Sequence, residues 1–470
     1  MSLSRSLFAH KARPLANLGV WISSNSNLLT ITAELKRQIG LRTATALVVG
    51  EVIAVGIFLT PASMAKALES PLWILVVWLV MGATAACGAL CYGELAARFP
   101  EAGGGYVYLR EAYGRPIAFL YGWMALLVMD PGLTAALAVG MGSYAGYILN
   151  LSPTGIKAVA VGTIVVLAGV NIYGVRLGAW LMRWLTILKL GLLLFLLLWG
   201  FGFQLGSWSN FTPFNARRTN SIPPVGALAG AMVAAFFSFG GWWDVTKLAG
   251  EVREPARTLP RALIYGVVIV TIVYILTSGI FLYLVPLSAV SSGEIFAAQA
   301  GEVLFGRAGG LVFSFIVIVA VLGSLSALIM SAPRVYFAMA RDGLFLPSAA
   351  VLHPRFGTPA RAIAVQTLLA SILVLLSNFN QIISYFIFVV VVFIALTVAA
   401  LFVLRRKQPN TAPYLTPGYP VTPVIFLLLV CLLLMLLGSG HPKESFLGVA
   451  VVALGVPVYY FFFRRTPDRS

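Results

Sequence analysis

Charged residues are scarce in this sequence of 470 residues. Asp, Glu, Lys and Arg make up 10% of the chain, whereas an ordinary soluble domain contains about 25%. Apolar residues reach 60%, and the mean hydropathy is +0.94. A soluble globule of this composition would expose apolar surface that it could not cover, and a disordered chain would not carry so much of it. The composition therefore predicts a membrane protein with several spans.

Cysteine and histidine are also scarce. Cys87, Cys91 and Cys431 fall inside long apolar runs, which disfavours a disulfide framework, and the three histidines lie outside those runs. The sequence shows no Cys/His metal spacing, no paired-carboxylate motif and no nucleophile elbow. It therefore predicts no metal site and no cofactor, and it disfavours a membrane enzyme such as an acyl or glycosyl transferase.

Long apolar runs, in contrast, are abundant. Twelve stretches have about the 20 residues that cross a bilayer core as a helix. Strand-length runs with alternating polarity are absent from the sequence, which disfavours a membrane β-barrel. The predicted spans are roughly 43–67, 72–97, 117–148, 157–174, 180–202, 226–247, 261–285, 309–333, 360–377, 380–404, 422–438 and 444–463.

The basic residues are distributed unevenly between the predicted loops. The chain has 32 Lys and Arg against 15 Asp and Glu, a net charge of +17, which by itself would suggest nucleic-acid binding. With a cytoplasmic N-terminus, however, the inside segments hold 25 of the basic residues and the outside segments hold 6. This is the positive-inside pattern, and it accounts for the net charge without nucleic acid. It predicts two cytoplasmic termini, and the sequence favours a prokaryotic inner membrane.

Glycine clusters occur near the middle of two spans. The first span contains Gly50 and Gly56, and the sixth contains Gly240 and Gly241 between aromatic residues. Glycine is also common in membrane helices because it permits close packing. Interruptions at corresponding positions of two halves, however, indicate a transporter binding site. Because the interruptions lie in spans one and six, they predict two five-span repeats, the second inverted.

Several motifs in a fixed order resemble the amino acid–polyamine–organocation superfamily, and within it the L-type amino-acid transporters. The resemblance covers about residues 40–410. The motifs are Gly56-Ile-Phe58, Thr60-Pro61, Cys91-Tyr-Gly-Glu94, Pro100 to Gly114, Phe237 to Trp242, Gly250 to Pro255, Arg257 to Pro260, Ala340 to Pro347 and Gly357 to Arg361.

The resemblance implies an all-α polytopic membrane protein with twelve transmembrane helices. Ten of them would form a leucine-transporter-like core of 5+5 inverted repeats with helices 1 and 6 broken, and two would be peripheral. The expected division is a cytoplasmic tail over 1–40, a core over 41–405 and peripheral helices with a short C-terminus over 406–470. Within the core, the repeats would cover about 41–202 and 226–405.

The resemblance also implies a substrate site between the interrupted parts of spans 1 and 6. Carried over by position, backbone amides around Ala54, Val55 and Gly56 would bind the substrate carboxylate. Helix N-termini favour anions, which agrees with this placement. Family members usually have Gly-Ser-Gly here, so this chain lacks the serine hydroxyl and carries a β-branched valine instead.

Span 6 would supply the other half of the implied site. Acceptors for the α-amine would lie around Phe237, Ser238, Phe239 and Gly240, and the Phe237 ring would cover the substrate on its outer side. Trp243 stands where a small or polar residue is common in the family. We therefore expect it to shrink or reshape the pocket.

Lys189 is an ionisable residue inside span 5, where a charge requires a reason. Its side chain could extend to the cytoplasmic interface. By resemblance, a lysine here points at the broken part of span 1 and occupies the region where related transporters hold sodium. This interpretation predicts transport without sodium, and a lysine that releases its proton would permit proton coupling.

Three acids also lie within spans. Asp244 follows the span 6 interruption and is either a cap for exposed amides or a substrate contact. Asp130 precedes Pro131 in span 3, and we expect it to cap the helix that restarts there. Glu51 lies one turn before the span 1 interruption, where it could be a proton site, a partner for Lys189 or a contact for a cationic substrate.

The leading hypothesis is a secondary transporter of amino acids that works by alternating access, through exchange or proton-coupled uptake. The alternative substrate is a polyamine or another organic cation, which would need only acids and aromatic rings such as Trp242. A nutrient sensor with the same fold is a further alternative. The external loop from Asn150 to Lys157 has no cysteine, so we expect no disulfide-linked heavy chain.

Overall fold

The computed structural model describes residues 35–54, 56–214, 225–287, 296–376, 379–409, 412–440 and 442–464. Over these ranges the chain is helical and contains no strand, and an isolated β-bridge pairs Ile39 with Val252. Most of the tail predicted for residues 1–40 lies outside the described residues.

The described part of the chain forms α-helices joined by short 3-10 and π-helical segments. The α-helices are α1 (Leu41–Val52), α2 (Gly56–Leu68), α3 (Pro71–Arg98), α4 (Gly105–Tyr113), α5 (Arg115–Met124), α6 (Asp130–Leu149), α7 (Pro153–Tyr173), α8 (Val175–Gly202), α9 (Val225–Phe239), α10 (Pro255–Leu284), α11 (Phe296–Phe305), α12 (Gly309–Ser331), α13 (Pro333–Arg341), α14 (Ala360–Leu376), α15 (Phe379–Lys407), α16 (Val421–Gly440) and α17 (Pro442–Val458). The 3-10 helices are η2 (Trp208–Phe211), η3 (Asp244–Glu251), η5 (Gly306–Ala308) and η6 (Pro347–Ala350), and the π-helices are η1 (Ala125–Met129) and η7 (Tyr459–Phe463).

The predicted spans correspond to these helices. In the described part of the chain, ten helical runs are long and apolar enough to cross a membrane, judged by length and composition. Of the other two predicted spans, the first is divided into α1 and α2, and the ninth is the 17-residue α14. The chain is therefore an all-α polytopic membrane protein. Its division into two inverted repeats stays a prediction.

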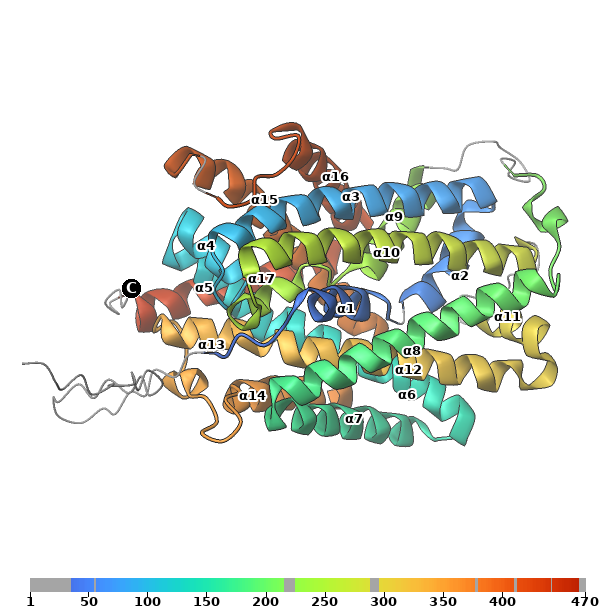
Figure 1. The fold of residues 1–470 in the computed structure, drawn as a ribbon, viewed down its shortest axis with the longest axis horizontal. Helices are drawn as coiled ribbons and strands as arrows, with labels where there is room; N and C mark the ends of the chain where they lie inside the picture. The colour runs from blue at the N-terminus through green and yellow to red at the C-terminus, as the bar shows by residue number, and fades with distance from the viewer. Residues whose placement is uncertain are drawn as a thin grey trace, which may run out of the picture. The chain divides into compact units, whose positions relative to one another are not determined.

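The two halves of span 1 lie within the helix bundle. The half α1 packs against α8, α10 and α12, whereas α2 packs against α9. The long helices α3 and α10 run side by side, and α1 and α2 are visibly separate helices (Figure 1). This packing holds the interruption of span 1 away from lipid, as an irregular backbone in a membrane requires.

Span 3 changes its helical geometry just before Asp130. The five residues Ala125–Met129 form a π-helical turn, and Pro131 stands in the first turn of α6. Proline has no amide hydrogen to donate, so its position fits a wider turn that releases the regular hydrogen-bond pattern. The turn directs the Asp130 side chain into the protein, where it is fully buried.

The segment between Pro100 and Gly114 contains α4 and is joined by side-chain contacts to the segment that follows α13. Arg110 forms an ion pair with Asp342 at 2.7 Å, and the Tyr106 hydroxyl donates to the same carboxylate at 2.8 Å. Burial lowers the pKa of Arg110, but the bond and charge of Asp342 outweigh this effect and raise that pKa above its ordinary value. The guanidinium therefore remains charged and holds the two segments together.

Two basic residues that the sequence assigned to cytoplasmic segments lie inside the protein. Lys247 and Arg334 have no exposed surface, so neither contributes a solvated charge to the cytoplasmic face. Both pair with buried acids, which offsets the desolvation of their charges. Without them the inside segments still hold 23 basic residues against 6 outside, so the predicted orientation keeps its basis.

Candidate functional site

The first span is interrupted where the glycine pattern predicted. The helix α1 ends at Val52, and the Ile53 amide still donates to the Val49 carbonyl at 3.0 Å. The Ala54 amide turns back to the Val52 carbonyl at 2.8 Å, and α2 begins at Gly56. Of the predicted carboxylate-binding residues, Val55 lies outside the described residues. The N-terminus of α2 nevertheless faces the interruption, where helical amides have no partner within the helix.

The sixth span is interrupted at its glycine pair. The helix α9 ends at Phe239, and the Gly240 amide donates to the Phe237 carbonyl at 3.1 Å. Gly241 has a φ of +102°, a conformation that side chains with a Cβ rarely adopt. The Asp244 amide then donates to the Gly241 carbonyl at 3.0 Å, and the chain continues as the 3-10 helix η3.

The halves α2 and α9 touch through small residues. A Cβ atom at Gly56 would lie 2.9 Å from the Cα of Ser238, which is too close for the backbone to accept. The hydroxyls of Thr60 and Ser238 lie 2.9 Å apart and hydrogen-bond each other. Gly56 is therefore required by close backbone approach as well as by its place in the predicted motif.

We expect Gly56→Ala to destabilise the protein by about 1–3 kcal/mol, because the added methyl group must displace the backbone at Ser238. Thermal unfolding of the purified protein would measure this loss. The matched control is Gly162→Ala in α7, where a Cβ atom meets nothing within 4 Å. Equal stability of the two variants would show that α2 and α9 separate without difficulty.

Lys189 of α8 points at the C-terminal end of α1, as the resemblance implied. Its ammonium donates to the carbonyl oxygens of Gly50 at 2.7 Å and Ile53 at 2.6 Å. The Ser324 hydroxyl of α12 lies 3.2 Å from the same nitrogen. The side chain is fully buried, so the alternative that it extends to the cytoplasmic interface was wrong.

Tyr274 of α10 joins the ends of both broken helices and was missed at the sequence level. Its hydroxyl lies 2.8 Å from the carbonyl oxygen of Val52 and 2.7 Å from that of Ser238, so its single proton can be donated to either. A buried tyrosine usually has such a partner, but the sequence does not indicate which one. Of the expected amine acceptors, the Phe237 carbonyl thus already accepts from the Gly240 amide, and the Ser238 carbonyl shares the Tyr274 proton with that of Val52.

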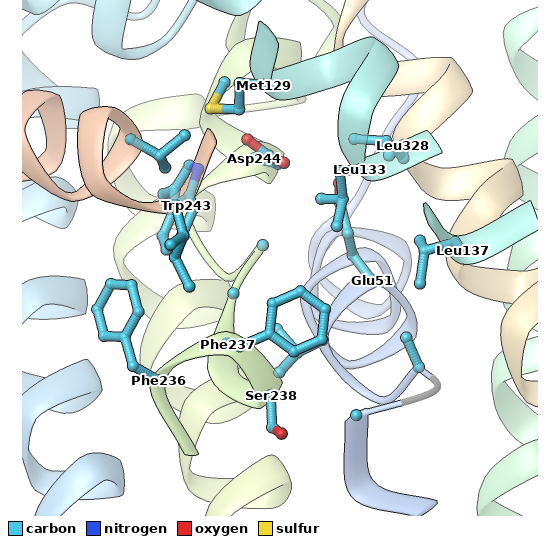
Figure 2. A pocket seen from close by; sticks show the side chains of 17 residues that line it. Glu51, Met129, Leu133, Leu137, Phe236, Phe237, Ser238, Trp243, Asp244 and Leu328 are labelled. Atoms are coloured by element: carbon cyan, nitrogen blue, oxygen red, sulfur yellow. The ribbon is translucent and has the colours of Figure 1, made fainter. Parts of the chain in front are cut away.

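A cavity of about 50 Å³ lies between the two interruptions, and a water molecule needs roughly 10–15 Å³. Figure 2 shows its wall, with Glu51 of α1 on the same side as several leucines, Asp244 at the start of η3, and Trp243 on the other side. Its lining residues are Glu51, Val52, Ala54, Gly56, Met129, Leu133, Leu137, Phe236, Phe237, Ser238, Gly240, Gly241, Trp243, Asp244, Leu328, Ile387 and Val390.

Most of the predicted substrate residues line this cavity, but three of the predicted site residues that the structure describes do not. Phe239 turns away and packs its ring against those of Trp78 and Tyr274, with centroids 6.0 and 5.1 Å apart. Lys189 and Asp130 lie behind the wall. Trp243 does face the cavity, which agrees with the expectation that it reduces the space available.

Behind the wall, Lys247 connects spans 3 and 6. Its ammonium lies 2.9 Å from Asp130 and 2.8 Å from Asp244, and all three side chains are buried. The Tyr336 hydroxyl of α13 donates to the other Asp130 oxygen at 2.9 Å. Neither acid caps a helix through its side chain, so the capping interpretation of Asp130 and Asp244 was wrong.

A second buried ion pair holds the far end of η3. Arg334 donates to Glu251 at 2.7 and 3.3 Å, and both side chains are buried. The Glu251 carbonyl accepts from the Gln38 amide at 2.7 Å, and the Arg253 amide donates to Ile39 at 2.8 Å. The segment before α1 is thus fixed to the segment after η3.

Comparison with known proteins agrees with this arrangement. A family model described as amino acid permease matches residues 39–463. The serine/threonine exchanger SteT of Bacillus subtilis (strain 168) is 32% identical over 92% of this chain and 98% of its own. The human large neutral amino acids transporter small subunit 2 is 31% identical over 91% of this chain and 80% of its own.

The human b(0,+)-type amino acid transporter 1 is more distant, at 28% identity over 92% of this chain and 89% of its own. These matches extend over the interrupted spans and the cavity between them. The chain therefore belongs to the amino acid permease family of the amino acid–polyamine–organocation superfamily.

Proposed function

We propose that the protein is a secondary transporter that carries amino acids across the cell membrane by alternating access. The observation that carries this proposal is the cavity between the two interrupted spans. The N-terminus of α2 offers free amides and a positive dipole end to a carboxylate, whereas the C-termini of α1 and α9 favour an ammonium group. These two preferences match the two charges that every amino acid carries.

The substrate preference rests on the similar proteins as well as on this geometry. Those cited above are named for amino acids, which favours amino acids over the polyamine alternative. A polyamine would leave the N-terminus of α2 without an anion. Exchange of one amino acid for another is the mode that the name of SteT suggests. We place both termini in the cytoplasm because the remaining basic residues are concentrated on that side.

Lys189 supports transport without sodium. The carbonyl oxygens of Gly50 and Ile53 are ligands of the kind that sodium prefers, but they accept from the Lys189 ammonium instead. A fixed positive charge at this place does the electrostatic work of a bound cation. A disulfide-linked partner subunit is also not part of this proposal, because the loop from Asn150 to Lys157 has no cysteine.

In proteoliposomes, uptake of a labelled neutral amino acid should be the same in sodium and choline buffers. The variant Lys189→Met should lose uptake by about tenfold or more, because two buried carbonyls lose a charged donor. Lys157→Met is the matched control, since Lys157 donates to the Leu375 carbonyl at 2.7 Å in an exposed position. Steep sodium dependence would contradict the role of Lys189, and uptake of polyamines alone would contradict the function.

A further inference from the structure

Glu51 is a buried acid on the cavity wall with an unused oxygen. The exposed fraction of Glu51 is 4%. One carboxylate oxygen lies 3.4 Å from the Ser331 hydroxyl, which is a long contact, and the other receives no hydrogen bond from a donor group in the described part of the chain. An acid in this position either keeps a proton or receives a cation from a ligand.

Asp244 faces the same part of the cavity from span 6. It is 2% exposed, and its carboxyl group lies within hydrogen-bond reach of the Glu51 carboxyl group. The two segments approach closely here, because a Cβ atom at Gly241 would lie 3.0 Å from the Cγ of Glu51. The two acids line the same cavity from different helices, Glu51 from α1 and Asp244 from η3 (Figure 2).

The charges around this wall do not balance. Glu51, Asp130 and Asp244 are acidic, and Lys247 is the cation that bonds directly to two of them. The Lys189 ammonium donates its hydrogen bonds to backbone carbonyls and Ser324 rather than to Glu51. Glu51 therefore has no direct cationic partner among the described residues.

The rest of the wall suits an alkyl chain. Leu133, Leu137 and Leu328 line the cavity on the side of Glu51, and Phe236 and Trp243 add aromatic faces. A side chain with an apolar stem and a charged end could place its methylene groups on these residues and its charge between the carboxylates. An aromatic ring beside an ammonium group adds a cation–π attraction.

We propose that Glu51 and Asp244 form a subsite for the cationic end of the substrate's side chain, so that the preferred substrates are amino acids with a terminal ammonium or guanidinium group. This inference rests on the proposed amino-acid transport, because the α-carboxylate and α-ammonium would still occupy the interrupted helix ends. A cationic substrate side chain would also compensate the negative charge of these acids, which a neutral amino acid would not.

The test compares three ligands of the purified full-length protein by calorimetric titration: lysine, norleucine and cadaverine. Norleucine has a similar shape to lysine but lacks the side-chain ammonium, and cadaverine lacks the carboxylate. We expect wild-type protein to bind lysine at least about tenfold more tightly than norleucine, as for a charge-assisted hydrogen bond. This comparison requires no variant, so it remains decisive even if a substitution prevents folding.

The variant Glu51→Gln should weaken lysine binding by about tenfold or more while norleucine binding stays the same. Asp244→Asn should have the same selective effect. Glu254→Gln is the matched control, because the Glu254 side chain is largely exposed, pairs with Arg257 and does not line the cavity. Binding of both ligands to that control should equal the wild-type values.

Equal losses of lysine and norleucine in Glu51→Gln would mean that Glu51 binds the α-ammonium, which overturns the inference. Binding of norleucine without lysine would also overturn it, while the proposed transport of amino acids would stand. Binding of cadaverine without either amino acid would instead refute the proposed function itself, and the inference with it.

Discussion

Replacing Lys247 by methionine is expected to lower the free energy of unfolding by about 3–5 kcal/mol. Lys247 lies 2.9 Å from Asp130 and 2.8 Å from Asp244, and both acids are buried. Methionine keeps most of the side-chain volume but removes the charge. Two carboxylates would then remain in the interior without a cation, which is the costly way to break a buried ion pair. Titration with SDS, followed by circular dichroism, would measure the loss.

The second variant of this experiment tests the cause of the loss. In the double variant Lys247→Met with Asp130→Asn, one uncompensated acid is removed, so part of the stability should return. Lys66→Met is the matched control, since Lys66 is exposed. If Lys247→Met were as stable as this control, the buried acids would be neutral in the native protein and would need no cation.

The long apolar runs and their interruptions could be predicted from the sequence because both are local properties. A span requires about 20 apolar residues in a row, and a mid-span Gly240-Gly241 pair allows the positive φ that ends a helix. In the first span, Gly56 begins α2, and its role is the close approach to Ser238. These signals lie in single windows of sequence, so no knowledge of the packing was needed.

The buried charge network could not be predicted in this way. Lys247 follows the interruption of span 6 at the end of an apolar run, and a lysine at such a position is usually exposed at the membrane surface. Its partner Asp130 is 117 residues away, and Tyr336 is 206 residues from Asp130. Only the tertiary fold brings these groups together. The count of charged residues in the predicted loops does not indicate that they pair.

The direction in which side chains point around an interruption also could not be predicted from the sequence. Phe237 and Phe239 are two residues apart, yet the first lines the cavity and the second packs against Trp78 and Tyr274. Which face of a short helix turns inward depends on its neighbours. The resemblance placed the site in this segment of span 6, but the packing determines which of its side chains line the cavity.

Replacing Arg334 by methionine is the other substitution with a large expected effect, about 3–5 kcal/mol of unfolding free energy. Arg334 is fully buried, and its guanidinium donates two hydrogen bonds to Glu251. The loss would leave Glu251 charged in the interior at the end of η3. Because the Glu251 carbonyl also holds the amides of Gln38 and Ile39, the segment before α1 should loosen as well.

Hydrogen exchange at Gln38 and Ile39 distinguishes this local effect from a general loss of stability. In Arg334→Met their amides should exchange faster than the amides of α7, which lies elsewhere in the bundle. Arg341→Met serves as the matched control, because Arg341 lies on the same helix but is exposed to solvent. If Glu251→Gln restored the stability of Arg334→Met, the uncompensated carboxylate would be the cause. No recovery, with normal exchange at Gln38, would mean instead that Arg334 stabilises α13 by packing rather than by its charge.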